Sequence, residues 1–308
     1  MATLTTYRRT LAPLLGSYDL ITAASSGSTT TAQLACTTLS ANGVSLISTV
    51  LSASEYKDKW MYRPAASASY DVSRLIVLYT PGSGILKADA TWTNAPTSEA
   101  VEILGLFPGT QLNLFVNEAL KRCWLTVEFT FTTSSSQTRR HSLATDAAWL
   151  TDPRWVYQVG ELASGESRSQ IDPFRRMRRG LAHKDGNVVY IEGPSFPTSS
   201  TVYVKAIKPA YSHCAAAATP TTFTQSGLSA ESDVATVDPE YVAWGAVIVA
   251  MDTLDSMERA GTATQEALQS RRMAAARFTH LMRTNFQEPE RTFRRIENIQ
   301  PTVGQRRW

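Results

Sequence analysis

Stretches of helical period alternate with stretches of strand-like period along this chain of 308 residues. The first is N-terminal, where large apolar side chains recur every three or four positions, as on one face of a helix. These side chains are Leu4, Tyr7, Leu11 and either Leu14 or Leu15. Gly16 stands where a C-terminal cap is expected, and Pro13 limits how far the last turn continues. The pattern predicts a short helix within 1–16.

A different pattern fills residues 17–105, where short apolar runs are separated by turn residues. The runs are VSLISTVL, KWMYRP, SRLIVLYTP, GILKADATWTNAP and AVEILGL. Runs of Val, Ile, Leu and aromatic residues that are bounded by Gly, Pro, Asn and Ser are typical of short strands. The stretch is therefore expected to form a small antiparallel β-module.

Helical period returns in 106–122 and gives way at once to strict alternation. One apolar stripe consists of Leu112, Phe115, Val116, Ala119 and Leu120. In the following CWLTVEFTFTT, every second residue from Cys123 to Phe131 is apolar, which is the clearest strand signal in the chain. Further strands are expected near 154–162, 187–193 and 201–208. We therefore expect a helix followed by an antiparallel β-domain over 123–208, with a basic loop at 166–186.

The C-terminal part predicts an irregular connector, a helical hairpin and an extended tail. Residues 209–235 are rich in Ala, Ser and Thr and show no period. The hairpin is expected over 236–285. Its first helix begins with Asp238 as N-cap, Pro239 and Glu240, and ends at Gly261. Its second helix begins with the capping box of Thr262 and Gln265. The residues expected on the inward face of this helix are Leu268, Ala275, Phe278, Leu281 and Met282.

These patterns together predict an α+β protein. Its helical bundle combines the N-terminal helix, the middle helix and the C-terminal hairpin. Antiparallel β-sandwich or barrel modules interrupt the bundle. An extended tail, 286–308, follows; it has five Arg against three Glu and large apolar residues without a steady period. A segment of this composition cannot form a core alone, and we expect it to become ordered on a partner.

Composition agrees with a globular chain and excludes several classes. Apolar residues make up 43% and charged residues 19% of the chain, and the net charge of +3 is too small for a generally cationic surface. The three cysteines, Cys36, Cys123 and Cys214, have no disulfide-framework spacing, which favours synthesis in a reducing cytosol. No signal peptide is expected. The most apolar run, 241–251, is too short to cross a bilayer and is expected to be a buried helix.

A search for reaction chemistry yields no enzyme signature. The sequence contains no phosphate-binding loop, no dinucleotide fingerprint, and no zinc-protease or serine-hydrolase motif. His141 and His183 are expected in basic loops, His213 adjoins Cys214, and His280 stands alone. Adjacent Cys and His side chains rarely share one metal in good geometry. We expect structural histidines, no cofactor, no metal and no enzymatic activity.

The most unusual local feature is the basic loop sequence PFRRMRRGLAHKDG. Its arginines are Arg175, Arg176, Arg178 and Arg179. A charge run is commonly only a solvated loop. Arginine in place of lysine suits bidentate contact with carboxylates or phosphates, and Phe174 and Met177 are placed to anchor the loop. The sequence therefore leaves a solvated loop and a partner-binding loop equally open, without any element for base-specific readout.

The predicted hairpin also contains charged residues suited to contacts between subunits. Asp252 and Asp255 lie three positions apart on its first helix, and Arg271 and Arg272 lie on its second. A solvated face or ion pairs with a neighbouring subunit both explain them better than acid–base catalysis. We take these four residues as candidate inter-subunit contacts.

Three stretches resemble the head–tail adaptor (connector) proteins of tailed bacteriophages. LNLFVNEALKRCWLTVEF, at 112–129, resembles their helix-then-strand segment, and residues 238–286 resemble their closing helical hairpin. KWMYRP with the run that follows, 59–96, resembles the β-module inserted in longer members. Together the three stretches cover about a third of the chain.

The resemblance implies a structural virion protein at the neck, between head and tail. It implies a homo-oligomeric ring, commonly a dodecamer, under the portal protein, with double-stranded DNA passing through the lumen and a further tail or nozzle protein below. It also implies that the C-terminal tail docks on the portal. The residues concerned are Arg291, Phe293, Arg294, Arg295, Ile296, Ile299, Arg306, Arg307 and Trp308. No membrane partner is expected.

One alternative function comes from another class. A packaging-associated protein that binds nucleic acid without sequence preference would use the arginine-rich loop and the tail directly. Its affinity for DNA would fall steeply with salt because counterions are released on binding. An enzyme such as a hydrolase is disfavoured, since the sequence offers no recognisable pair of nucleophile and base.

Overall fold

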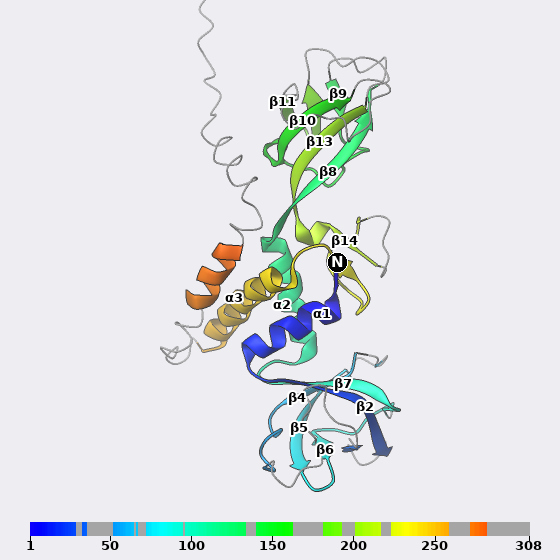
Figure 1. The fold of residues 1–308 in the computed structure, drawn as a ribbon, viewed down its shortest axis with the longest axis vertical. Coiled ribbons are helices and arrows are strands. Elements are labelled where there is room, and N and C mark those ends of the chain that lie inside the picture. The colour runs from blue at the N-terminus through cyan, green and yellow to red at the C-terminus, as the bar shows by residue number, and fades with distance from the viewer. Residues whose placement is uncertain are drawn as a thin grey trace, which may run out of the picture. The chain divides into compact units, whose positions relative to one another are not determined.

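A computed structural model describes residues 1–28, 33–35, 52–64, 66, 72–94, 96–133, 140–162, 181–192, 201–216, 223–258 and 272–281. The fold is mixed α+β, with helices and several antiparallel sheets (Figure 1). The chain divides into two compact units. Unit 1 comprises Met1–Cys123 and His213–Phe278, and unit 2 comprises Trp124–Ser212 and Thr279–Trp308.

The N-terminal helix of unit 1 is α1 (Leu4–Leu11), continued by the 3-10 helix η1 (Ala12–Leu15). The side chain of Thr3 caps α1 by accepting the N–H of Thr6 at 3.2 Å. The predicted stripe is buried, and Leu15 rather than the more exposed Leu14 continues it. The α-helix gives way to a 3-10 helix at the turn that contains Pro13, which lacks the N–H that would continue the α-helical hydrogen bonds.

Helices α2 (Gly109–Arg122) and α3 (Pro239–Glu258) complete this part of unit 1. All five residues of the apolar stripe predicted for α2 are buried. The carboxylate of Asp238 accepts the N–H groups of Glu240 at 2.8 Å and Tyr241 at 3.2 Å, which confirms the predicted N-cap. Each of α1, α2 and α3 contacts the other two.

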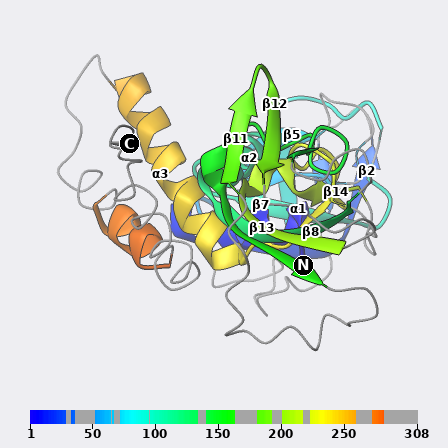
Figure 2. The ribbon, with the colours of Figure 1, turned by 90° about the horizontal axis from the view of Figure 1, so that it is seen from above.

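A second helical segment, 272–281, lies alongside α3 (Figure 2). The ring of Phe278 stacks on Tyr241 with 4.9 Å between ring centroids, and Arg277 pairs with Glu240 at 2.7 Å. Gly245 permits this approach, since a Cβ there would lie 2.8 Å from Cε2 of Phe278. These contacts pack 272–281 against α3, while the turn predicted at Gly261, Thr262 and Gln265 lies outside the described residues.

The inward face predicted for 272–281 is partly wrong. Ala274 is fully buried and Ala275 is exposed, while Phe278 and Leu281 are half-buried. A one-residue error rotates the assigned face by about 100° in a helix. Runs of alanine such as 274–276 give no signal to fix that rotation. Leu268 and Met282 lie outside the described residues.

The β-module of unit 1 is an antiparallel sheet that closes on itself. Its strands pair in the order β2-β3-β6-β5-β4-β7, and β7 pairs with β2 again. The strands are β2 (Tyr18–Ser28), β3 (Gln33–Ala35), β4 (Trp60–Tyr62), β5 (Ser73–Thr80), β6 (Ile85–Ala88) and β7 (Glu99–Leu104). Strands β4, β5, β6 and β7 match predicted runs, whereas β2 and β3 match none. The run VSLISTVL lies outside the described residues.

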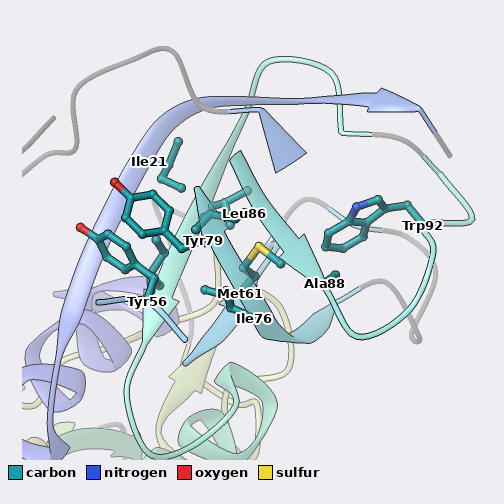
Figure 3. Packing of buried hydrophobic residues seen from close by; sticks show 10 residues of the cluster. Ile21, Tyr56, Met61, Ile76, Tyr79, Leu86, Ala88 and Trp92 are labelled. Atoms are coloured by element: carbon teal, nitrogen blue, oxygen red, sulfur yellow. The ribbon is translucent and has the colours of Figure 1, made fainter. Parts of the chain in front are cut away.

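Apolar side chains from these strands and their loops fill the space inside the closed sheet (Figure 3). They are Ile21, Tyr56, Met61, Ile76, Tyr79, Leu86, Ala88, Trp92, Val101 and Ile103. Tyr56 and Tyr79 meet edge to face, with 4.9 Å between ring centroids. Pairing of β5 with β6 shifts register between Ile76 and Leu78, so the alternation of buried and exposed residues is interrupted there.

A small sheet joins the N-terminus to the region predicted as an irregular connector. Its order is β1 (Ala2–Thr3), β15 (Val234–Ala235) and β14 (Cys214–Ala215). The prediction for 209–235 was therefore incomplete. Two-residue strands are too short to show a period, and their hydrogen bonds depend on partners far away in the sequence.

Unit 2 contains two antiparallel three-stranded sheets. The first has the order β10 (Val156–Leu162), β13 (Thr201–Pro209) and β8 (Trp124–Thr132), and the second has the order β11 (Leu181–Asp185), β12 (Val188–Glu192) and β9 (Arg140–Ser142). The 3-10 helices η2 (Pro153–Trp155) and η4 (Ala210–Ser212) adjoin β10 and β13. One apolar core includes Phe131, Val159, Ile191 and Val204, from four of these strands.

The second sheet corrects one expectation and confirms another. His141 and His183 lie on β9 and β11, where loops were expected. These polar sequences carry no strand pattern of their own, and they form strands because they pair with β12. The turn predicted at KDG is present between β11 and β12, and Gly186 has a φ of 59°, a value that favours glycine.

Candidate functional site

Most of the residues expected to bind partners lie outside the described residues. This applies to the loop arginines Arg175, Arg176, Arg178 and Arg179, to the tail 286–308, and to Arg271. Asp255 lies on α3, and Arg272 is exposed on the segment 272–281. The partly exposed carboxylate of Asp252 lies 3.7 Å from a guanidinium nitrogen of Arg122 on α2. Asp252 is thus engaged within its own chain.

Neither a metal centre nor a membrane span is found in the described ranges. In these ranges, no group of three or more His, Cys, Asp or Glu side chains is arranged to hold a metal ion. Their helices also lack the combined length and hydropathy needed to cross a bilayer.

A buried polar cluster in unit 1 is the most developed arrangement of functional groups in the described chain. We call it the Arg8 cluster. Its members come from α1, β4, β7, α2 and the loop before β15, and they are Thr5, Arg8, Arg9, Tyr62, Glu102, Asn113 and Glu231. The side chains of Arg8 and Glu102 are fully buried. Buried charges require partners, so the geometry around these two side chains determines whether the cluster is stable.

Arg8 and Glu102 form a two-point ion pair. The Nε and Nη2 atoms of Arg8 donate to the two carboxylate oxygens of Glu102 at 2.6 and 3.1 Å. Arg9 donates to the same carboxylate from its Nε at 2.8 Å. Two guanidinium groups therefore share one buried carboxylate, which leaves a positive charge that a second acid must balance.

Glu231 is that second acid. Its Oε1 atom accepts hydrogen bonds from Nη1 of Arg8 at 2.8 Å and from the hydroxyl of Tyr62 at 2.7 Å. Its Oε2 atom accepts the hydroxyl of Thr5 at 2.5 Å. Asn113 completes the arrangement, because it accepts from Arg8 at 3.0 Å and donates to the Tyr62 hydroxyl at 3.1 Å.

The ring of Tyr62 forms one wall of the cluster. The guanidinium carbon of Arg8 lies 4.3 Å from the ring centroid, within cation–π range. The ring also lies against the first residue of α2, Gly109, where a Cβ would overlap the ring carbons Cγ and Cδ2. Glycine at 109 is therefore needed for the position of Tyr62.

The pKa values of the cluster follow from burial and pairing. Burial alone would lower the pKa of Arg8, but the hydrogen bond and the charge of Glu102 outweigh burial and raise it. Burial alone would raise the pKa of Glu231, but the charge of Arg8 and the hydrogen bonds from Thr5, Tyr62 and Arg8 lower it. Both groups are held in their charged forms. The cluster is therefore suited to ionic recognition and to holding elements together.

The sequence contained a signal for Arg8 that went unused. Arg8 lies four positions after Leu4 and three before Leu11, so it is part of the predicted apolar stripe of α1. A charged residue at such a position needs a buried counter-ion. Glu102 likewise stands between the buried residues Val101 and Ile103. The link to Glu231, 223 positions after Arg8, has no counterpart in local sequence.

A second polar group lies on the β9–β12–β11 sheet of unit 2. The guanidinium of Arg140 lies 3.8 Å from the ring centroid of Tyr190 and pairs with Asp185 at 2.8 Å. His183 lies 3.3 Å from Glu192. His141 lies 2.9 Å from Asp146 and stacks on Phe131, with 3.8 Å between ring centroids.

His183 also stacks on Tyr190, with 5.5 Å between ring centroids. Both histidines therefore have an acidic partner and an aromatic neighbour, which fits a structural role. Taken with the Arg8 cluster, the described residues present ion pairs and stacked rings, the groups that hold elements and partners together. Comparison of the chain with protein-family models, with curated proteins and with solved structures finds no match.

Proposed function

We propose that this protein is a structural component of a tailed-phage virion that forms a ring adaptor between the portal and the tail. One arrangement supports the proposal. Helix α2 leads directly into β8, and α3 packs with 272–281 as a helical hairpin. These two features coincide with two of the three stretches that resemble head–tail adaptors.

Under this proposal, the helices and sheets have separate roles. We infer that α1, α2, α3 and 272–281 act as a bundle through which neighbouring copies meet. The closed sheet is then the inserted barrel module, and the sheets of unit 2 form the sandwich module. The lumen passes double-stranded DNA, and no cofactor or membrane takes part.

The contacts between copies would use charges on the hairpin. Asp252, Asp255, Arg271 and Arg272 are the proposed inter-subunit residues, and a ring repeats each contact around its axis. The pair of Asp252 with Arg122 leaves both side chains partly exposed to such a contact. The tail 286–308 would dock on the portal. The loop arginines would bind a neighbouring copy or the next tail protein.

Two measurements test the ring. Mass photometry and negative-stain images compare the purified chain alone with the chain mixed with portal. The mixture should show a closed ring of this chain on the portal. A virion reconstruction should place multiple copies in the neck. A single copy there, or none, would contradict the proposal.

A charge reversal makes the test specific to the proposed interface. Arg272→Glu should leave the melting temperature of the monomer unchanged, since the residue is exposed, and should reduce the ring population. Lys57→Glu makes the same charge change at another exposed position of unit 1 and should leave the ring intact. Equal effects of the two variants would exclude Arg272 from the interface.

The alternative, a non-specific nucleic-acid-binding protein, rests on the arginine run at 175–179. It predicts tight DNA binding by the isolated monomer that weakens steeply between low and moderate salt. Measuring DNA affinity against salt concentration distinguishes the two functions. A steep slope without ring formation would favour the alternative.

A further inference from the structure

The loop before β15 is docked in unit 1 in the manner of a bound peptide. Its shape is held by its own hydrogen bonds. Oδ2 of Asp233 accepts the N–H groups of Ser229 at 2.6 Å and Ala230 at 2.8 Å, and the amide of Gln225 at 2.7 Å. The loop is therefore a turn held by its own hydrogen bonds, and its contacts with α1, α2 and β4 are separate from the bonds that shape it.

The first of these contacts is at Leu228. The side chain of Leu228 is buried. The side-chain amide of Asn117, on α2, forms hydrogen bonds with both the N–H and the C=O of Leu228. Asn117 donates to the carbonyl of Leu228 at 2.9 Å and accepts its N–H at 2.8 Å. This contact pairs both main-chain polar groups of Leu228 next to its buried apolar side chain, a combination of polar and apolar contacts that is common in peptide-binding sites.

The second contact is at Glu231, three positions later. Its carboxylate receives donors from Thr5, Arg8 and Tyr62 at 2.5 to 2.8 Å. These donors come from α1 and β4, and the partners Glu102 and Asn113 hold Arg8 in place. The side chain of Glu231 is 27% exposed whereas that of Arg8 is fully buried. The receptor side of the contact is thus the fixed part, and the carboxylate enters from the surface.

We propose that this surface is a recognition site for a short segment with an apolar residue followed three positions later by a carboxylate. Leu228–Glu231, which we call the docked segment, is its resident ligand. The docked segment acts as a latch between the loop and the surface of α1, β4 and α2. When the apolar side chain of Leu228 and the charge of Glu231 are both removed, the resident segment is held less tightly and the site accepts the same segment supplied as a separate peptide. The proposal does not depend on the adaptor function.

Peptide complementation tests the site. The full chain is made with Leu228→Ala and Glu231→Gln together, which removes the apolar side chain and the charge of the resident ligand. A synthetic peptide of residues 223–235 is added, and melting temperature and affinity are measured. We expect a saturable rise in melting temperature. A peptide with Gln in place of Glu231 should bind at least roughly tenfold more weakly, because charge-assisted hydrogen bonds are lost.

Two controls separate recognition from general stabilisation. The unaltered chain should not respond to the peptide, because its site is occupied. Glu240→Gln removes an exposed carboxylate in the same unit and should behave like the unaltered chain. The proposal is wrong if the double variant shows no rise, if the two peptides act equally, or if the unaltered chain responds as strongly.

A second measurement applies if the double variant does not fold. Glu231→Ala leaves Leu228 in place and opens a space for a small carboxylate beside Arg8 and Tyr62. At neutral pH and equal ionic strength, acetate should raise the melting temperature of Glu231→Ala more than chloride does. For Glu240→Ala, each salt should change the melting temperature by the same amount as for the unaltered chain. Equal effects of acetate and chloride on Glu231→Ala would overturn the carboxylate site.

Discussion

At the scale of single residues, Glu102 should contribute the largest electrostatic effect in the Arg8 cluster. It pairs with both Arg8 and Arg9 from a fully buried position. Glu102→Gln keeps the shape of the side chain and leaves two guanidinium groups short of a counter-ion. Removing one partner of a buried pair costs about 3–5 kcal/mol, and we expect the free energy of unfolding to fall by that amount. Urea unfolding measures it.

A matched control uses a carboxylate in an exposed pair. Glu118 lies 2.5 Å from Lys121 on α2, and both side chains are about half exposed. Exposed pairs contribute about 0–1 kcal/mol, so Glu118→Gln should hardly change the free energy of unfolding. A loss at Glu102 no greater than that at Glu118 would contradict the role assigned to the cluster.

Asp233 should make the stability of unit 1 depend on acid pH. Burial alone would raise its pKa, but hydrogen bonds from the backbone of Ala230 and Ser229 and from the side chain of Gln225 lower it below the usual 3.8. A lowered folded-state pKa means that the carboxylate stabilises the fold above the unfolded-state pKa. This stabilisation is lost as the pH falls through the folded-state pKa.

Asp233→Asn should therefore destabilise the protein at pH 7 and matter less at low pH. Unfolding by urea at pH 7 and at about pH 2.5 gives the difference between the two chains at each pH. We expect the gap to narrow in acid. A gap of the same size at both pH values would show that the charge of Asp233 is not the source of its effect.

At the scale of elements, the contact between α2 and β4 depends on the absence of a side chain at Gly109. Alanine favours a helix more than glycine does, so propensity alone predicts that Gly109→Ala is stabilising. Its Cβ would instead overlap the ring of Tyr62, which hydrogen bonds to Glu231 and Asn113 hold in place. We expect a net loss of about 1–3 kcal/mol in thermal or urea unfolding. Gly82→Ala has open space around the new Cβ and should be nearly neutral.

The sequence predicted those elements whose own consecutive residues show a helical period, a helix cap or a strand alternation. The stripe of α2, the cap of α3 at Asp238 and the alternation of β8 each extend over several consecutive residues, and all three are present. Strands β9 and β11 were missed because they form by pairing with β12, and their own sequences show no strand pattern.

The Arg8 cluster was missed for a related reason. Arg8 and Glu102 each stand out locally, as charged residues at buried positions. Their pairing joins positions 94 residues apart, and neither periodicity nor composition specifies which charge meets which. Contacts of this kind depend on the packed arrangement of several elements, so they can be derived only from the folded chain.

At the scale of the whole molecule, the C-terminal tail should matter to assembly and not to folding. Residues 286–308 have five arginines and no apolar period, a composition that does not build a core. Deleting them should leave the melting temperature of the monomer nearly unchanged and abolish attachment to the portal. Calorimetry and co-sedimentation with portal measure the two effects. Normal neck assembly by the shortened chain would count against portal docking by the tail.

The four loop arginines should matter to assembly through contact with protein. A ring repeats Arg175, Arg176, Arg178 and Arg179 around its axis, so a loop that faced the lumen would surround DNA with a dense positive girdle. Strong phosphate contacts would hinder ejection, and the net charge of only +3 agrees with a lumen that is not uniformly basic. Pairing with carboxylates of a neighbouring copy or of the next tail protein avoids that difficulty and uses the two-point geometry of arginine.

Replacing all four arginines by Gln distinguishes these two positions of the loop. Glutamine keeps hydrogen-bonding capacity and removes the charge, so the effect reports on ionic contacts. If the arginines bind protein, heads should fill with DNA normally while tails fail to attach, as electron microscopy of the particles would show. If they face the lumen, tails should attach normally, and DNA retention or ejection rate should change instead. That second result would reverse the assignment of the loop to a protein partner.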